Sequence, residues 1–100
     1  MVVIVFRARM KPGFNEAEIG EMGAHMYGLA TKMPGFISYQ DYAGSDGSNV
    51  TIVEFESHET LKAWREHPEH QVVQKAGRER FFSEYRITVC DMVRDYSFRA

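Results

Sequence analysis

The sequence predicts an α+β domain built around a four-stranded antiparallel sheet. Four segments alternate apolar and polar residues with the period of a β-strand, and apolar residues recur at helical spacing between them. Pro-Gly pairs and a polar turn separate these segments. The predicted order is strand, helix, strand, strand, helix, strand, which is the βαββαβ arrangement of ferredoxin-like folds.

The first strand is predicted over residues 2–10 and ends at Lys11-Pro12-Gly13, because proline and glycine interrupt strands. Asn15 is a suitable N-cap for the helix that follows. The apolar residues of this helix recur at three- and four-residue steps and predict its buried face: Ile19, Met22, Met26, Leu29, Ala30 and Met33.

Three glycines interrupt this first helix at Gly20, Gly23 and Gly28. Each weakens a helix by about 1 kcal/mol relative to alanine. Glycines at such positions either allow close packing or leave room for a ligand, and we expect close packing.

The middle of the chain predicts a β-hairpin. Pro34-Gly35 ends the first helix, and Ser45-Asp46-Gly47-Ser48 has the composition of a turn. The two strands on either side of this turn are predicted over residues 36–44 and 49–56.

The last part of the chain predicts two helical segments and a strand. Ser57 is the predicted N-cap of the helix that carries Trp64. A break is predicted at His67, because Pro68 disfavours helical backbone in the residue before it and can itself begin the next helix. Residues 84–98 are predicted as one long final strand.

Most predicted strands are apolar on both faces, although the helices of one chain cover only one face of a sheet. In the first strand, Val3 and Val5 lie opposite the face that carries Ile4 and Phe6. We therefore expect a homodimer that buries the second sheet face against its twin, with the end of the final strand reaching the partner.

Composition and charge exclude several classes of protein. The chain has 100 residues, 26% of them charged, and a net charge of -2, which predicts a single globular domain over residues 1–100. No apolar run approaches about 18 residues and no basic tract occurs, so neither membrane nor nucleic acid is an expected partner. The only cysteine is Cys90, so no internal disulfide can form, and we expect its side chain to act as a small buried apolar group. The N-terminus alternates like a strand rather than a signal peptide, and we expect a cytoplasmic location.

Residues 53–70, together with Pro34-Gly35-Phe36 and residues 85–96, resemble the antibiotic biosynthesis monooxygenase (ABM) family. The motifs are Leu-x-x-Trp, ending at Trp64, followed by His-Pro-x-His over residues 67–70. The resemblance implies a dimeric α/β barrel with a cavity between helices and sheet. Family members include cofactor-independent oxygenases, quinol oxygenases and haem-degrading enzymes.

The first candidate site residues are Trp64, His67 and His70. The resemblance places an active-site tryptophan at Trp64, and core packing is compatible with that role. His70 is either a general base or a structural histidine. His67 is a candidate for substrate binding, although capping at the helix break is the interpretation that we favour.

The strands supply Arg7, Tyr39 and Tyr85 as further candidates. Arg7 and Arg9 need partners on a partly apolar face, and an ion pair with Glu54 or Asp41 is favoured. The alternative is that Arg7 binds an anionic oxygen of a substrate. Tyr39 and Tyr85 could donate a hydrogen bond to a carbonyl, although strand tyrosines are also ordinary.

These features predict a small monooxygenase that oxidises an aromatic or quinol-type molecule without a cofactor. In this prediction His70 takes the proton, Trp64 shapes the cavity, and Arg7 or Tyr85 stabilises the oxyanion. No phosphate-binding glycine loop and no complete zinc spacing occurs, so neither organic cofactor nor metal is expected. The alternatives are a non-catalytic dimeric domain that binds a hydrophobic molecule and, third, haem binding or degradation. Gln74 stands where the haem-degrading branch has a histidine.

Overall fold

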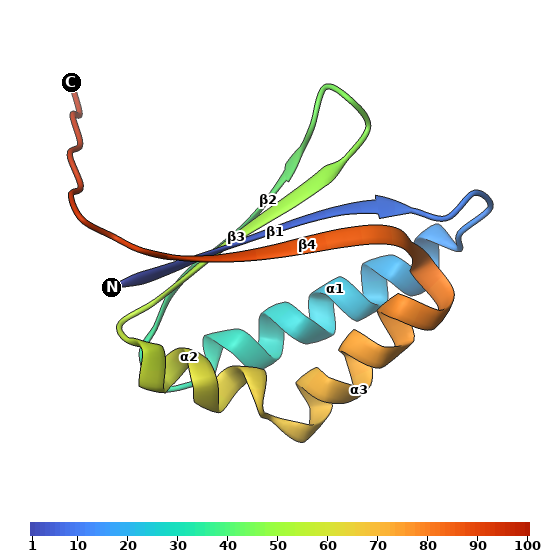
Figure 1. Ribbon diagram of the computed structural model, residues 1–100, viewed down its shortest axis with the longest axis horizontal. Coiled ribbons are helices and arrows are strands. Elements are labelled where there is room, and N and C mark those ends of the chain that lie inside the picture. Colours follow the sequence, from blue (N-terminus) through green and yellow to red (C-terminus); the bar gives the residue numbers. More distant parts are fainter.

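Four antiparallel strands form one sheet, and the helices pack on one of its faces (Figure 1). The computed structural model describes residues 1–100. The strands pair in the order β2-β3-β1-β4. Their bounds are β1 (Val2–Met10), β2 (Phe36–Ala43), β3 (Asn49–Phe55) and β4 (Phe82–Asp91). The helices are α1 (Glu16–Thr31), α2 (His58–Arg65) and α3 (Pro68–Ala76), with a single π-helical turn, η1 (Gly77–Phe81), before β4. The predicted ferredoxin-like βαββαβ fold is confirmed.

Side chains near each helix start satisfy backbone N–H groups that have no partner within the helix. Asn15 caps α1, because its Oδ1 accepts a hydrogen bond from the Glu18 N–H at 3.0 Å. Ser57 and Thr60 form a capping box at the start of α2, in which the Thr60 hydroxyl accepts from the Ser57 N–H at 3.1 Å. Pro68 is the first residue of α3. All three predicted helix starts are confirmed.

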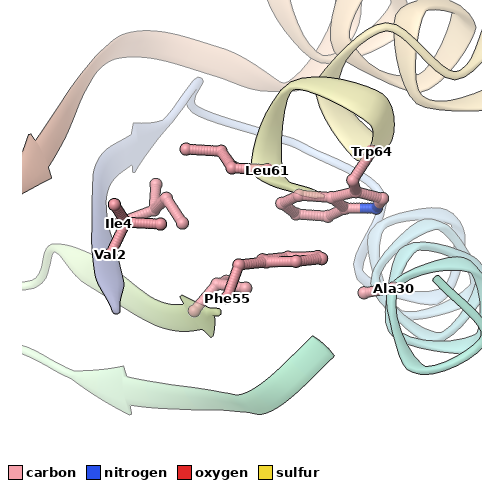
Figure 2. Close-up of a cluster of buried hydrophobic side chains, with 7 residues drawn as sticks. Val2, Ile4, Ala30, Phe55, Leu61 and Trp64 are labelled. Carbon is pink, nitrogen blue, oxygen red and sulfur yellow. The ribbon is translucent and has the colours of Figure 1, made fainter. Parts of the chain in front are cut away.

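The core lies between the helices and the sheet face that carries Val2 and Ile4 (Figure 2). These two residues pair across the strands with Phe55 and Val53, so four apolar side chains share one face. Helices α1 and α2 complete the buried cluster with Ala30, Leu61 and Trp64. This packing holds α2 against the sheet and thereby positions Trp64.

The opposite side of the sheet, called here the uncovered face, has no helix on it (Figure 1). Val3, Val5 and Ile52 point to this face and are half-buried within one chain. Cys90 pairs with Val3 on the same face and is exposed. The prediction that Cys90 is buried is therefore wrong for the single chain, because nothing in that chain covers this face.

The final strand is shorter than the predicted 84–98 because β1 supplies no partner beyond Val2. Val2 pairs with Asp91, and the Met92 N–H then donates to the Met1 carbonyl oxygen at 3.0 Å. Residues 92–100 adopt no regular secondary structure and extend away from the body of the molecule (Figure 1). Their large apolar side chains are exposed: Val93, Tyr96 and Phe98.

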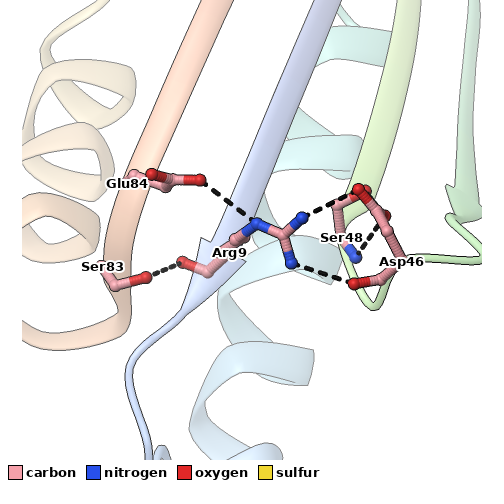
Figure 3. A network of polar contacts seen from close by, with 5 residues as sticks. All are labelled: Arg9, Asp46, Ser48, Ser83 and Glu84. Carbon is pink, nitrogen blue, oxygen red and sulfur yellow. Dashed lines mark hydrogen bonds and ion pairs between the residues drawn. The ribbon is translucent and has the colours of Figure 1, made fainter.

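Arg9 is paired, although with different acids from those predicted (Figure 3). Its guanidinium lies 2.8 Å from the Asp46 carboxylate and 3.2 Å from that of Glu84. The register places Arg9 beside Glu84 and near the β2–β3 turn that holds Asp46. The expected partners Glu54 and Asp41 accept hydrogen bonds from Ser38 and Thr51 instead. These Arg9 pairs are solvent-exposed, so each contributes little to stability.

Candidate functional site

A cavity of about 810 Å³ lies between the helices and the sheet. Of the 26 residues that line it, 17 are hydrophobic. They come from α1, α2, α3 and all four strands. A mostly apolar cavity of this size, with a few polar groups in its wall, is typical of small-molecule sites.

Part of the cavity wall on α1 lacks side chains. Gly20 and Gly23 both line the cavity, and Gly28 lies further along the same helix. A methyl group at any of the three positions would meet no atom within 4 Å. The predicted close packing at these glycines is therefore wrong: Gly20 is exposed, and Gly23 is half-buried in the cavity wall.

Trp64 and His70 form a polar corner of the cavity, and both line it. Their ring centroids lie 4.5 Å apart with the planes at 61°, while Phe55 stacks on Trp64 at 5.4 Å. Both side chains are more than nine-tenths buried. The indole Nε1 of Trp64 and the Nδ1 of His70 have no hydrogen-bond partner. Buried polar atoms are nearly always paired, and neither of these two atoms has accessible surface, so both are enclosed by the packing of this corner rather than open to the cavity.

The chemistry of His70 follows from its surroundings. Burial lowers the pKa of His70 below its ordinary value of 6.5, while a hydrogen bond to the Arg65 backbone opposes this shift. The nearby charges of His67 and Arg65 lower the pKa further. Nδ1 is enclosed and has no hydrogen-bond partner, so Nε2 is the ring nitrogen left to face the cavity. His70 is thus neutral near pH 7 and able to take a proton.

A second polar region lies on β2 and β3 at Tyr39, Asp41 and Thr51, all of which line the cavity. The Thr51 hydroxyl donates to Asp41 Oδ1 at 2.5 Å. Burial, together with the nearby Asp41 carboxylate, raises the pKa of Tyr39 to about 12. Tyr39 therefore keeps its proton and can act as a donor. The sequence analysis does not identify Asp41 as part of this wall. Its position two residues after Tyr39 on one strand could have indicated it, because residues two apart share a sheet face.

Tyr85 lines the cavity from β4 within an aromatic cluster. Its ring stacks on Phe6 at 5.4 Å and meets Phe82 edge-on at 5.9 Å. Arg78 Nη1 donates to the Tyr85 hydroxyl oxygen at 3.3 Å. Because Arg78 is the donor in this contact, the Tyr85 hydroxyl proton stays free for another acceptor.

The structure does not bring Arg7 or His67 to the cavity. Arg7 is exposed on the uncovered face, where it pairs across the strands with Val50 and Arg86. His67 caps α3, because its Nδ1 accepts a hydrogen bond from the Glu69 N–H at 3.1 Å. The favoured capping interpretation of His67 is confirmed. Neither position supports contact with a molecule in the cavity of the same chain.

Neither a metal-binding cluster nor a membrane-spanning helix is found. No group of three or more His, Cys, Asp or Glu side chains converges in a way that could hold a metal ion. The His58 Nε2 lies 2.6 Å from the Asp91 carboxylate at the protein surface, which makes a pair rather than a metal-binding set. None of the helices has the length and apolar character needed to cross a bilayer.

Fold and cavity together define a ferredoxin-like α+β domain with an interior large enough for a small molecule. The family model for antibiotic biosynthesis monooxygenases matches residues 1–76, and the chain belongs to this family.

Three relatives illustrate how far the similarity extends. The uncharacterised Bacillus subtilis protein YqjZ is 29% identical over 85 residues, which cover 85% of this chain and 75% of YqjZ. The structure of Rv0793 from Mycobacterium tuberculosis matches with a TM-score of 0.81 and 21% identity, covering 96% of this chain and 98% of Rv0793. SnoaB, a cofactor-independent oxygenase from Streptomyces nogalater, matches with a TM-score of 0.78 and 18% identity over 94% of each chain. At these identities the two structures show a shared fold.

Proposed function

We propose that this protein is a cofactor-independent monooxygenase that oxidises an aromatic, quinol-type or anthrone-type molecule in the cavity. The observation that carries the proposal is a mostly apolar cavity whose wall includes His70, Trp64, Tyr39 and Tyr85. A planar aromatic molecule with a hydroxyl or carbonyl oxygen would bury its rings among the apolar side chains and place its oxygen beside these polar ones. Membership of the ABM family and the shared fold of SnoaB support the same reaction class.

The reaction begins with a proton transfer. His70 takes a proton from the acidic C–H or O–H of the substrate, and the resulting anion gives one electron to dioxygen. The two radicals combine to form a peroxide at the substrate carbon. For an anthrone, loss of water from this peroxide leaves a quinone, so that one oxygen atom enters the product and the other leaves as water. The proton on His70 returns to the departing hydroxide and restores the neutral imidazole.

The cavity offers donors for the charge that develops on the substrate oxygen. The Tyr85 hydroxyl proton is free, and Tyr39 stays protonated because burial and the nearby Asp41 carboxylate raise its pKa to about 12. A fixed donor in a water-poor site stabilises an oxyanion without reorganising during the reaction. Arg7, the alternative candidate for stabilising the oxyanion, lies on the other sheet face. Tyr85 is therefore the residue proposed to stabilise it.

The active form is proposed to be a homodimer joined through the uncovered face. Val3, Val5, Val50 and Ile52 give this face an apolar centre, and Tyr42 and Ile37 add exposed apolar surface on β2. Apolar surface of this kind on a small domain favours association with a matching surface, and a twofold axis brings the same face of two chains together.

Oxygen consumption tests the proposed function. Purified protein is mixed with anthrone or menadiol in air-saturated buffer, and dioxygen uptake is followed with an electrode while product is identified by mass. We expect uptake well above the uncatalysed rate and incorporation of one oxygen-18 atom from labelled dioxygen into the product from anthrone. Quenching of Trp64 fluorescence without any oxygen uptake would instead favour a non-catalytic binding domain, for which the apolar cavity is equally suited.

A further inference from the structure

Arg7 and Arg86 are two positive charges that lie side by side without an acidic partner. The register of β1 and β4 places them directly opposite each other on the uncovered face. Neither guanidinium makes an ion pair within the chain. Like charges directly opposite each other on neighbouring strands destabilise the pairing of those strands. A carboxylate beside the two guanidiniums would remove this repulsion.

A recess of about 340 Å³ lies next to these two arginines and is called here the arginine recess. Its charged side chains are Arg7, Arg9, Arg86, Asp46 and Glu84. Arg9 is already paired with Asp46 and Glu84 (Figure 3). The charges without a counterion in the recess are therefore those of Arg7 and Arg86. Guanidinium groups bind carboxylates through strong, charge-assisted hydrogen bonds, so the recess is suited to a carboxylate.

Glu54 on β3 is the complementary charge on the same face. It pairs across the strands with Val3 and is half-buried. Its Oε1 accepts a hydrogen bond from the Ser38 hydroxyl at 2.6 Å, but no cation of the chain forms an ion pair with it. Arg7 pairs instead with Val50, at the other end of β3. The ion pair between Arg7 and Glu54 that the sequence favours therefore does not form within one chain.

A twofold axis that lies between two facing sheets and crosses their strands brings these charges together. Glu54 is level with Val3, and Val5 lies midway between Val3 and Arg7 along β1. Rotation about an axis level with Val5 reverses the strand direction, so that Glu54 of the partner subunit lies level with Arg7. The same rotation places Val5 and Ile52 against their own copies and buries the apolar centre of the uncovered face. Since Arg7 loses water in this interface, it needs an acidic partner there.

We propose that the arginine recess of each chain binds the Glu54 carboxylate of the partner subunit, so that two symmetry-related sets of ion pairs fix the register of the dimer. Arg7 and Arg86 supply the guanidinium groups, while the Ser38 hydroxyl orients the carboxylate. The inference rests on the homodimer of the proposed function and is independent of the oxygenase reaction. A free carboxylate or phosphate ion in the recess is the competing occupant.

Charge reversal on the uncovered face tests this inference. The dimer dissociation constant is measured by sedimentation of a dilution series, or from the concentration dependence of urea unfolding where dilution does not separate the subunits. Glu54→Arg should weaken the dimer by about a hundredfold or more, because like charges then face each other across the interface. Arg7→Glu should weaken it as well. The double variant Arg7→Glu/Glu54→Arg restores the attraction and should recover at least about tenfold of the loss.

The matched controls are Glu21→Arg and Lys75→Glu. Both residues are exposed, on α1 and α3, and these helices pack on the other face of the sheet. Both variants should leave the dissociation constant unchanged. Glu54→Gln removes the charge but keeps an acceptor for Ser38, and it serves if the reversed variants fold poorly. It should weaken the dimer by about tenfold or more.

The outcomes separate the partner's carboxylate from a free ion and from the reaction. A dimer of Glu54→Arg as tight as those of the controls, or a double variant without recovery, would overturn the inference. Weakening by Arg7→Glu alone, with a parent dimer that tightens when sodium phosphate replaces sodium chloride at equal ionic strength, would place a free anion in the recess instead. A monomeric parent protein would overturn the inference and leave the oxygenase reaction to be decided by oxygen uptake. The expected dissociation constants without any oxygen uptake would uphold the inference and remove the reaction.

Discussion

The imidazole ring of His70 meets the indole ring of Trp64 edge-on, with centroids 4.5 Å apart and planes at 61°. Trp64 in turn stacks on Phe55, a fully buried residue of β3, at 5.4 Å. The polar corner of the cavity is therefore attached to the hydrophobic core rather than carried on a loop. Because Trp64 belongs to the core, a substitution at this corner can alter both the stability of the fold and the activity. The two effects are therefore measured separately.

Replacing His70 tests its role as the base. His70→Ala should lower the oxidation rate by about a hundredfold or more while leaving ligand affinity nearly unchanged, since a general base acts in the transition state. His67→Ala is the matched control, because this neighbouring histidine caps α3 outside the cavity. It should lower the stability by about 1 kcal/mol and leave the rate per folded protein unchanged. Similar rates in both variants would remove the base assignment.

The pH dependence has a defined direction. Burial lowers the pKa of folded His70 below 6.5, so the base stays neutral and the oxidation rate should hold constant down to that pH, then fall in more acidic buffer. The unfolded chain binds this proton more readily than the folded chain. The stability contributed by neutral His70 is thus complete above pH 6.5 and is lost as the pH falls below it. Chemical unfolding at pH 7 and pH 5 should show a smaller loss of stability in His70→Gln than in the parent protein.

Trp64→Phe separates packing from hydrogen bonding. The smaller ring can still stack on Phe55, but the unpartnered Nε1–H is removed. Because Nε1 has no accessible surface, ligand affinity should stay close to that of the parent protein, as measured by calorimetry. Trp64→Ala removes the core contacts as well and should destabilise the fold by about 3–5 kcal/mol. A tenfold or greater loss of affinity in Trp64→Phe would show that the indole nitrogen does contact the ligand.

Gly35 tests a close approach at the end of α1. Its φ of 81° is unfavourable for other residues, and an added Cβ would lie 2.5 Å from Thr60 of the capping box. Gly47→Ala is the matched control, with a φ of 85° and no atom within 4 Å. Both variants should lose about 1–2 kcal/mol to backbone strain, and Gly35→Ala should lose more because Thr60 must move. Equal urea midpoints for the two variants would contradict the predicted clash.

The proposed dimer predicts that a charge on the uncovered face separates the subunits. Val5→Asp should shift sedimentation at micromolar concentration from the dimer mass toward the monomer mass, because an unpaired carboxylate would be buried in the interface. Val72→Asp is the control, since Val72 is 68% exposed on α3. A parent protein that sediments as a monomer would remove the dimer from the proposal.

Several features could be predicted from the sequence because they depend on neighbours within a few positions. Asn15 and Ser57 cap helices whose apolar spacing is visible in the chain, and Pro68 begins α3 as expected. The sequence also identifies Trp64, His70, Tyr39 and Tyr85 as candidates, and all four line the cavity. The length of β4 could not be predicted in the same way, because a strand ends where its partner β1 ends.

The order of elements, the helix starts and the aromatic and histidine side chains available to a site can be deduced from the amino-acid sequence alone. Those properties follow from local periodicity and capping, which operate within one or two helical turns. Long-range packing is needed to place Arg9 beside Asp46, 37 positions away, Arg7 on the sheet face away from the cavity, and Gly23 next to open space. Strand register and the spacing between helix and sheet control these outcomes, because they set which distant side chains meet and which buried atoms remain without a partner.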